Sequence, residues 1–235
     1  MKISSATHLG LVRKVNEDRC FVREFGNGAA MVAVADGLGG HAAGERAAEI
    51  ATESLDAFDM SSQALDTHMA QLAEHANRRI LDASARDLSL NGMGTTLTAA
   101  FIDGAAAHWV HVGDSRLYLF REDVLVQVTE DHTLAGLLLR IGEISAEEAR
   151  IHPARNMLSS CLGRCDFEAD TGTLGLLEND LLLLSTDGLH DRVAEQDIAD
   201  ILGRSASIKD KVDFLVEAAL AAGGRDNITV VAAKI

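Results

Sequence analysis

Several aspartates in this chain stand where predicted β-strands begin or end, a placement that suits metal-assisted chemistry. They are Asp36, Asp114, Asp187 and Asp226. Asp36 directly follows the apolar run Met31–Ala35, and Asp187 comes just after Leu181–Ser185. Carboxylates that converge repel one another unless a cation neutralises them. Because every ligand would be an oxygen, we expect Mg²⁺ or Mn²⁺ rather than Zn²⁺.

A plainer reading of the same residues stays open. An Asp-Gly pair at the end of a strand, such as Asp36-Gly37 or Asp187-Gly188, is also typical of an ordinary turn. Four such aspartates with specific neighbours favour the metal-site interpretation. Their spacing alone does not establish that the four side chains converge.

The elements that would position these aspartates follow from the hydrophobic pattern. Apolar and β-branched runs predict strands at Met31–Ala35, Thr95–Ile102, His108–Val112, Leu117–Arg121, Leu181–Ser185 and Ile228–Ala232. Apolar residues spaced three and four apart predict helices at Glu45–Phe58, Ser62–Leu88 and Ile208–Ala222. The last helix is followed by Gly223-Gly224, which should stop it. Strands, then two long helices, then strands again predict an α+β fold with layered antiparallel sheets and helices outside.

Composition favours one domain and excludes some partners. The 235 residues are 47% hydrophobic, with a single proline and no Pro/Ser-rich linker, so we predict one domain over residues 1–235. The formal net charge of −15 should repel nucleic acid and anionic lipid. We therefore expect neither a nucleic acid nor a membrane as a partner.

The cysteines and the apolar segments indicate the compartment. Cys20, Cys161 and Cys165 are odd in number and lack the spacing of a disulfide framework or a zinc site, so we expect reduced thiols. Met1–Leu11 contains no long apolar run, and charged residues interrupt Leu174–Leu184. We expect a cytoplasmic protein.

The chain resembles the type 2C metal-dependent protein phosphatases in their compact bacterial form. The matching motifs occur in family order and span residues 10–230, and together they are far more specific than any one alone. They are Gly10-Leu-Val-Arg-Lys-Val-Asn-Glu-Asp18, Val34-Ala-Asp-Gly-Leu-Gly-Gly-His41 with Gly44, Gly94-Thr-Thr96, Val112-Gly-Asp-Ser-Arg116 with Tyr118, Thr129-Glu-Asp-His132, Leu184-Ser-Thr-Asp-Gly-Leu189 with Asp191, and Asp226-Asn-Ile-Thr-Val230.

This resemblance implies a fold and a reaction. The fold is a four-layer sandwich of two antiparallel β-sheets flanked by α-helices. The reaction is the hydrolysis of phosphoserine and phosphothreonine in proteins. A hydroxide that bridges two metal ions attacks phosphorus directly, and no phosphoenzyme forms.

The resemblance also implies metal ligands, for two or three Mg²⁺ or Mn²⁺ ions in all. Asp36 would bridge two ions, and the carbonyl of Gly37 would help to bind one of them. Asp187 and Asp226 would complete the ligand shell of the other. Further implied ligands are Glu17 and Asp18, directly or through water, Asp114 for a third and weaker ion, and Asp191 as a less certain contributor.

Two residues are candidates for binding the substrate or donating a proton to it. Arg13 would bind the phosphate, because a planar guanidinium can hold two oxygens at once. Its plainer reading is a surface salt bridge. In part of the family a histidine that follows the Asp-Gly pair is a proposed general acid. Here Leu38 has that place, and the nearby His41 would either donate the proton or only order water.

Residues 135–156 form an insert that the resemblance identifies as a flap beside the active site. Ser145 and Glu148 fit a capping box, so a short helix should begin there. The alternative is an ordinary helical connection, and the sequence does not separate the two.

We expect phosphorylated proteins as substrates, a cognate serine/threonine protein kinase as the opposing enzyme, and a monomer. Three other readings stay open. One is a catalytically inactive relative that only binds phosphoproteins, and another is a dedicated regulator of one signalling protein. The third is a different metal hydrolase, such as a nucleotidase.

Overall fold

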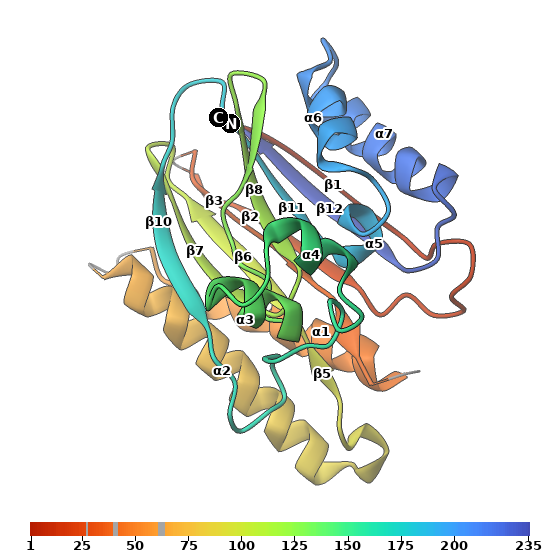
Figure 1. The fold of residues 1–235 in the computed structure, drawn as a ribbon. Coiled ribbons are helices and arrows are strands. Elements are labelled where there is room, and N and C mark those ends of the chain that lie inside the picture. The colour runs from red at the N-terminus through yellow and green to blue at the C-terminus, as the bar shows by residue number, and fades with distance from the viewer. Residues whose placement is uncertain (27, 40–41, 61–63) are drawn as a thin grey trace.

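The structure is a computed structural model that describes all residues of the chain except 27, 40–41 and 61–63. Two five-stranded sheets pack face to face, and helices cover both outer faces (Figure 1). Every strand pair in the two sheets is antiparallel. The predicted α+β sandwich is therefore confirmed.

The first sheet has the strand order β1-β12-β11-β8-β9 and the second has β10-β7-β6-β3-β2. The first consists of β1 (Lys2–His8), β12 (Ile228–Lys234), β11 (Leu181–Ser185), β8 (Arg116–Arg121) and β9 (Val124–Gln127). The second consists of β10 (Asp170–Gly175), β7 (Ala106–Val112), β6 (Leu97–Ile102), β3 (Ala30–Ala35) and β2 (Arg19–Glu24). A small extra pair joins β4 (Gly37–Leu38) to β5 (Gly94–Thr95).

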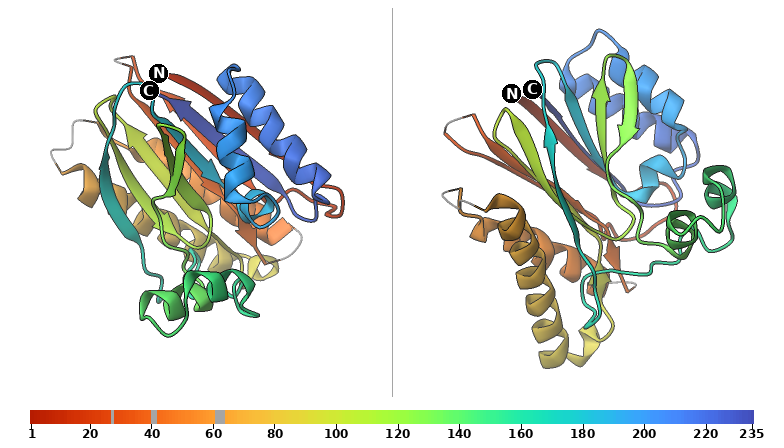
Figure 2. Two further views of the ribbon diagram at one scale, coloured as in Figure 1. Left: turned by 45° about the horizontal axis from the view of Figure 1, so that its top comes forward. Right: turned by 60° about the vertical axis from the view of Figure 1, so that its left-hand side comes forward.

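The helices form the outer layers. The second sheet is covered by α1 (Ala42–Ser54), the 3₁₀ turn η1 (Leu55–Ala57) and α2 (Leu65–Arg86), with a further 3₁₀ turn η2 at Leu88–Leu90. The first sheet is covered by α5 (Asp187–His190), α6 (Glu195–Gly203) and α7 (Ile208–Ala221). Two short helices, α3 (Leu134–Arg140) and α4 (Ala146–Ile151), project beside one end of the sandwich (Figure 2, green).

Side chains of the central strands point alternately to the two faces of the sheet, and this explains why the sequences of these strands are apolar throughout. In β11, Leu181 and Leu183 pack against the helices, whereas Leu182 and Leu184 pack against the other sheet. In β3, Val32 and Val34 likewise face the sheet opposite. Successive side chains of a strand point to opposite faces, and here both faces are buried. A continuous apolar run is the expected result.

The predicted elements agree closely with the structure where they are long or central. The runs at 31–35, 108–112, 117–121, 181–185 and 228–232 all lie within strands. The predicted strand 95–102 is interrupted at Thr96, which separates β5 from β6. Within the described residues, no helix is both long enough and apolar enough to cross a membrane.

The strand register places the candidate residues at one end of the sandwich. Arg19 at the start of β2 pairs with Ala35 at the end of β3, and Leu97 at the start of β6 pairs with Val112 at the end of β7. In the other sheet, Ser185 at the end of β11 pairs with residues at the starts of β8 and β12. The loops next to all these strand ends therefore meet on one side of the molecule.

Candidate metal centre

Carboxylates from both sheets gather at this end of the sandwich. Asp18 precedes β2, Asp36 follows β3, Asp114 lies in the turn between β7 and β8, Asp187 begins α5, and Asp226 precedes β12. They are close enough to affect one another's ionisation: Asp36 is influenced by the other four, and Asp187 by Asp18, Asp114 and Asp226. The structure therefore places these aspartates near one another, and their role as metal ligands stays a prediction.

Burial and mutual repulsion make the ionised form of this cluster costly. The pKa of Asp36 is raised well above its ordinary value, first by burial and then by its carboxylate neighbours, and Asp187 behaves in the same way. Burial is also the main cause that raises the pKa of Asp114 to about 7 and that of Asp18 to about 6. A bound cation is the group that would relieve this repulsion.

The cluster also contains buried oxygen atoms that lack a hydrogen-bond partner within the described residues. They are Oδ1 of Asp18 and Oδ1 of Asp187. The second oxygen of Asp18 does have a partner, since Thr186 Oγ1 donates to it over 2.8 Å. Buried carboxylate oxygens without a donor are rare, because they cost free energy unless something replaces the lost water. The oxygen-only donor set fits a hard divalent cation.

The backbone packs tightly around Gly37. A methyl group at Gly37 would lie 2.3 Å from the carbonyl oxygen of Gly44 and 2.6 Å from that of Glu17. A side chain at Gly44 would in turn lie 2.7 Å from Oε1 of Glu17. Only glycine allows this approach, which brings the loop that carries Glu17 and Asp18 against the end of β3.

Arg13 reaches into the cluster from the loop between β1 and β2. Its Nη2 donates to Oδ2 of Asp226 over 2.7 Å. This contact raises the pKa of Arg13 further above its ordinary value, and the charges of Glu17 and Asp36 act in the same direction. The side chain is still 49% exposed, so it can contact a ligand that arrives from solvent. Arg13 therefore does form a salt bridge, as the plainer interpretation expected, but its partner Asp226 is itself a residue of the candidate site.

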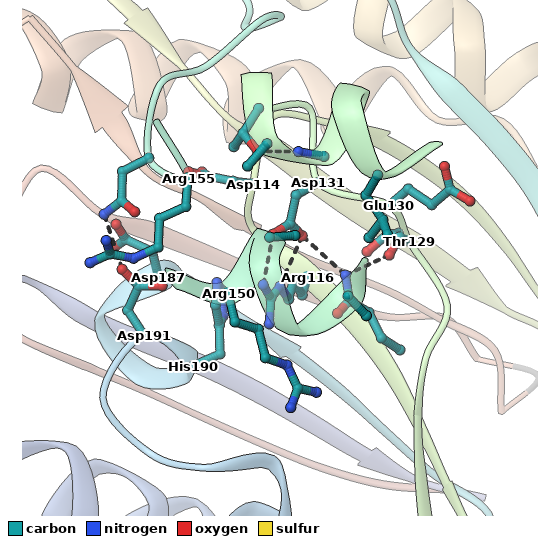
Figure 3. Close-up of a pocket in the computed structure, with 18 of the residues that line it drawn as sticks. Asp114, Arg116, Thr129, Glu130, Asp131, Arg150, Arg155, Asp187, His190 and Asp191 are labelled. Carbon is teal, nitrogen blue, oxygen red and sulfur yellow. Dashed lines mark hydrogen bonds and ion pairs between the residues drawn. The ribbon is translucent and has the colours of Figure 1, made fainter. Parts of the chain in front are cut away.

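A pocket of about 690 Å³ opens beside the cluster (Figure 3). Its walls include Asp114, Asp187 and Asp191. The insert contributes Leu139, Arg150, Arg155 and others to the same walls. The insert thus borders the same space as Asp114, Asp187 and Asp191, and its role as a flap stays a prediction.

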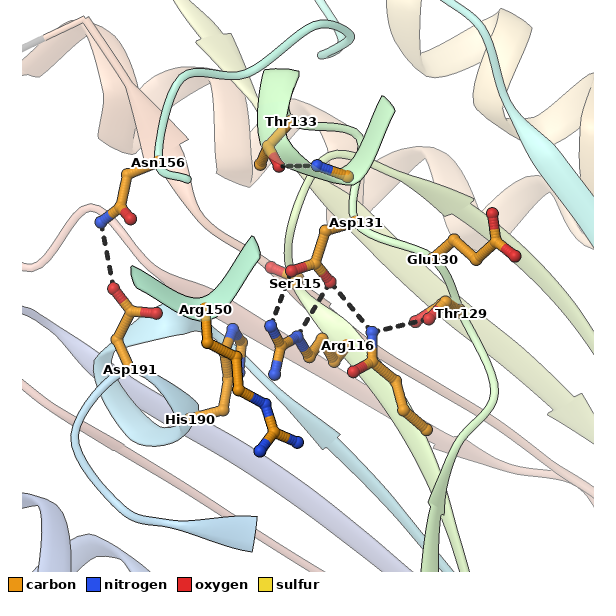
Figure 4. Close-up of polar contacts among 12 residues, drawn as sticks. Ser115, Arg116, Thr129, Glu130, Asp131, Thr133, Arg150, Asn156, His190 and Asp191 are labelled. Atoms are coloured by element: carbon orange, nitrogen blue, oxygen red, sulfur yellow. Dashed lines mark hydrogen bonds and ion pairs between the residues drawn. The ribbon is translucent and has the colours of Figure 1, made fainter. Parts of the chain in front are cut away.

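The insert is attached to the body of the protein by polar contacts (Figure 4). Nδ2 of Asn156 donates to Oδ2 of Asp191 over 3.0 Å. Arg150 forms an ion pair with Glu195 at 2.8 Å. Two capped helices form the insert and its start. Thr133, just before the insert, accepts from Gly136 N at the start of α3, and Ser145 and Glu148 form the predicted capping box at α4.

Asn227, a neutral residue that the sequence analysis did not single out as a candidate, holds the loops of the site in place. Asn227 donates to the carbonyl oxygens of Leu9 and Val15 and accepts from the backbone N–H of Glu17. The loop that carries Arg13 is therefore anchored to the start of β12. The only sequence signal was the position of Asn227 next to Asp226.

His132 fixes the turn before Asp114. Its Nδ1 accepts from the backbone N–H of Gly113, and its own backbone N–H donates to the Gly113 carbonyl over 2.7 Å. Nε2 of His132 lies 3.1 Å from Oδ2 of Asp170, which orients the ring. These contacts give His132 a structural role at the turn.

The structure thus brings together Arg13, Glu17, Asp18, Asp36, Gly37, Asp114, Asp187, Asp191 and Asp226. His41 lies outside the described residues. Among the residues that the structure does describe, no three His, Cys, Asp or Glu side chains are grouped as a finished ligand shell. Donors such as Arg13, Thr186 and Asn156 engage the cluster instead. The fit to a cation therefore rests on the kind of donors and on the oxygens left without partners.

The chain is similar to known proteins over most of its length. The family model of protein phosphatase 2C matches residues 12–222. The serine/threonine phosphatase Stp of Listeria welshimeri is 40% identical over 231 residues, which cover 95% of this chain and 92% of that protein.

Solved structures agree with the sequence match. The serine/threonine phosphatase PstP/Ppp of Mycobacterium tuberculosis is 34% identical, with a TM-score of 0.92 and coverage of 100% of this chain and 98% of that chain. The catalytic domain of PstP in complex with two manganese ions is 33% identical, with a TM-score of 0.87 and the same coverage.

Proposed function

The chain belongs to the protein phosphatase 2C family of serine/threonine phosphatases, and from this premise we propose that it hydrolyses phosphoserine and phosphothreonine in proteins with two or three bound Mg²⁺ or Mn²⁺ ions. The observation that carries the proposal is the cluster of mutually repelling carboxylates, with the unpartnered oxygens of Asp18 and Asp187 inside it. The manganese in the related PstP structure supports the choice of metal.

The residues of the cluster have distinct roles in this proposal. Asp36 would hold both ions, the Gly37 carbonyl would help to bind one of them, and Asp187 and Asp226 would complete the ligand shell of the other. The remaining ligands are Glu17, Asp18, Asp114 and, as a less certain contributor, Asp191. When bound, the ions would activate a water molecule as the nucleophile and offset the charge on the phosphate oxygens.

Arg13 orients the phosphoryl group of the substrate. Its exposed guanidinium sits at the edge of the cluster, where it can exchange Asp226 for two phosphate oxygens. Water gives up a proton and forms the new bond to phosphorus while the bond to the serine or threonine oxygen breaks. That oxygen takes up a proton, for which His41 is the candidate donor, and no phosphoenzyme forms.

We further propose that residues 1–235 act as one catalytic domain, with residues 135–156 as the flap. Phosphoproteins are its substrates and a serine/threonine kinase supplies them. The expected location is the cytoplasm and the expected state is a monomer. The −15 charge disfavours nucleic acid and anionic lipid surfaces as partners.

Substrate selectivity tests the proposed reaction. The purified protein with Mn²⁺ is given phosphothreonine, phosphoserine and phosphotyrosine peptides and AMP, and phosphate release is measured. We expect turnover of the first two, and no labelled protein after an acid quench with ³²P-labelled peptide. A preference for AMP would indicate a nucleotidase, and peptide binding without turnover would indicate a binding module.

Replacing Arg13 with alanine should weaken the enzyme mainly through substrate binding. The loss of a charge-assisted, two-point contact should lower kcat/KM by about tenfold to a hundredfold, with most of the change in KM. Steady-state kinetics on a phosphothreonine peptide measures this. Arg13→Lys should recover part of the loss, and Arg78→Ala on the exposed face of α2 is the matched control. If Arg13→Ala mainly weakened Mn²⁺ binding, its assignment to the phosphate would be wrong.

A further inference from the structure

Two buried hydroxyl groups lie between the end of β3 and the turn that carries Asp114. Thr96 Oγ1 and Ser115 Oγ are 2.7 Å apart, and both residues are fully buried. Thr96 directly precedes β6 of the second sheet, and Ser115 directly precedes β8 of the first sheet. Their hydrogen bond therefore connects the two halves of the sandwich beneath the carboxylate cluster.

Thr96 is also bonded to the backbone of Asp36. The backbone N–H of Asp36 donates to Thr96 Oγ1 over 2.9 Å, and the backbone N–H of Thr96 donates to the Asp36 carbonyl over 2.9 Å. Thr95 Oγ1 donates to the same carbonyl over 2.8 Å. The peptide groups on both sides of the Asp36 side chain are therefore held by threonines.

Ser115 and Gly113, the two neighbours of Asp114, hold its turn against Thr96. Thr98 Oγ1 donates to the Ser115 carbonyl over 2.9 Å. Gly113 has a φ of +106°, and a methyl group on it would lie 2.6 Å from Cγ2 of Thr96. Both neighbours of Asp114 in the turn therefore meet the Thr96 side chain. Gly113 packs against it, and Ser115 forms a hydrogen bond with it.

We propose that Thr96 and Ser115 are positioning residues that fix the Asp114 turn relative to the end of β3, so that the affinity for divalent cations depends on their hydroxyl groups. Asp36 and Asp114 repel each other when no ion is bound, and the repulsion would move the turn away from the strand. A buried hydrogen bond between the two supporting residues opposes that movement. The inference rests on the proposed metal-dependent function.

The test compares Mn²⁺ binding to the wild type, Thr96→Val, Ser115→Ala and the double variant by calorimetry, with the Mn²⁺-induced rise in melting temperature as a second readout. Thr96→Val keeps the side-chain shape and removes the hydroxyl. We expect roughly tenfold weaker Mn²⁺ binding in Thr96→Val, the usual size of effect for groups that orient metal ligands. Ser115→Ala should lose less, because the Asp36 N–H keeps its acceptor. The double variant should bind like Thr96→Val, since the two hydroxyls act as one unit.

Thr52→Val is the matched control, because the Thr52 hydroxyl is also buried but bonds only within α1, to the carbonyls of Ala48 and Glu49. This variant should bind Mn²⁺ like the wild type. Unchanged Mn²⁺ affinity in Thr96→Val would overturn the inference and leave the proposed function intact. Additive losses in the double variant would overturn the coupling between the hydroxyls. A wild type that binds no Mn²⁺ would overturn the inference and the proposed function together.

Discussion

The Asp36→Asn variant should be folded and almost inactive, with kcat/KM for a phosphothreonine peptide lowered by about a thousandfold or more, which corresponds to roughly 4 kcal/mol of lost transition-state stabilisation. Asp36 stands at the centre of the cluster, influenced by Asp18, Asp114, Asp187 and Asp226. The amide keeps the shape of the side chain but removes the charge that would hold two ions together.

The same substitution separates catalysis from stability. Because the amide relieves repulsion among buried carboxylates, the melting temperature of Asp36→Asn in EDTA should equal or exceed that of the wild type. In Mn²⁺ the order should reverse, since only the wild type gains stability from bound ions. Asp82→Asn, on the exposed surface of α2, should change neither quantity. Asp36→Asn with most of its turnover intact would refute the bridging role.

Gly188→Ala should destabilise the protein by about 3 kcal/mol or more, which is large for the addition of one methyl group. Gly188 lies in α5, directly after Asp187, and a methyl group there would lie 1.8 Å from the Asn227 carbonyl oxygen and 2.9 Å from its carbon. The contact is with backbone, so no side chain can move aside. The helix would have to shift away from β12, and this would separate Asp187 from Asp226.

Urea unfolding in EDTA measures this cost without any contribution from metal. Gly175→Ala in β10 is the control, because a methyl group there would meet no atom within 4 Å. An unfolding midpoint of Gly188→Ala close to that of Gly175→Ala would show that α5 can move off β12 at little cost. It would also show that the close approach does not fix the positions of the two aspartates.

The sequence predicted the buried centre of the fold well and its edges poorly. The strands at 31–35 and 181–185 are buried on both faces, so their apolar runs are continuous. The edge strands β1, β2, β9 and β10 are half exposed and mix polar with apolar residues, as in Asp170–Gly175. A strand that buries only part of its surface leaves a weak pattern, and none of these four was predicted.

The helices likewise were predicted where their hydrophobic pattern is long and were missed where it is short. The predicted helix 208–222 corresponds to α7, and Gly223 and Gly224, with φ of +112° and +47°, end it as expected. The predicted helix 62–88 corresponds to α2 at Leu65–Arg86. The helices α5 and α6 were missed, because α5 has only four residues and α6 nine. Short helices contain too few turns for a periodic pattern.

For the candidate site, residue types were easier to predict than geometry. Strand-end aspartates pointed to the acidic cluster, but its convergence depends on the antiparallel register of both sheets. The supporting residues Thr96, Ser115 and Asn227 are neutral and small. Within the sequence they look like ordinary strand and turn residues, and only their contacts in the fold distinguish them.

The most direct test of the account is a Mn²⁺ titration of phosphothreonine-peptide hydrolysis, with the bound ions counted by calorimetry on the same metal-free sample. We expect two or three ions to bind, with turnover that rises with their occupancy, stops on addition of EDTA and returns when Mn²⁺ is restored in excess. Turnover that persists in EDTA, or saturation with Mn²⁺ that brings no turnover in the folded protein, would contradict the metal-dependent phosphatase proposed from the carboxylate cluster.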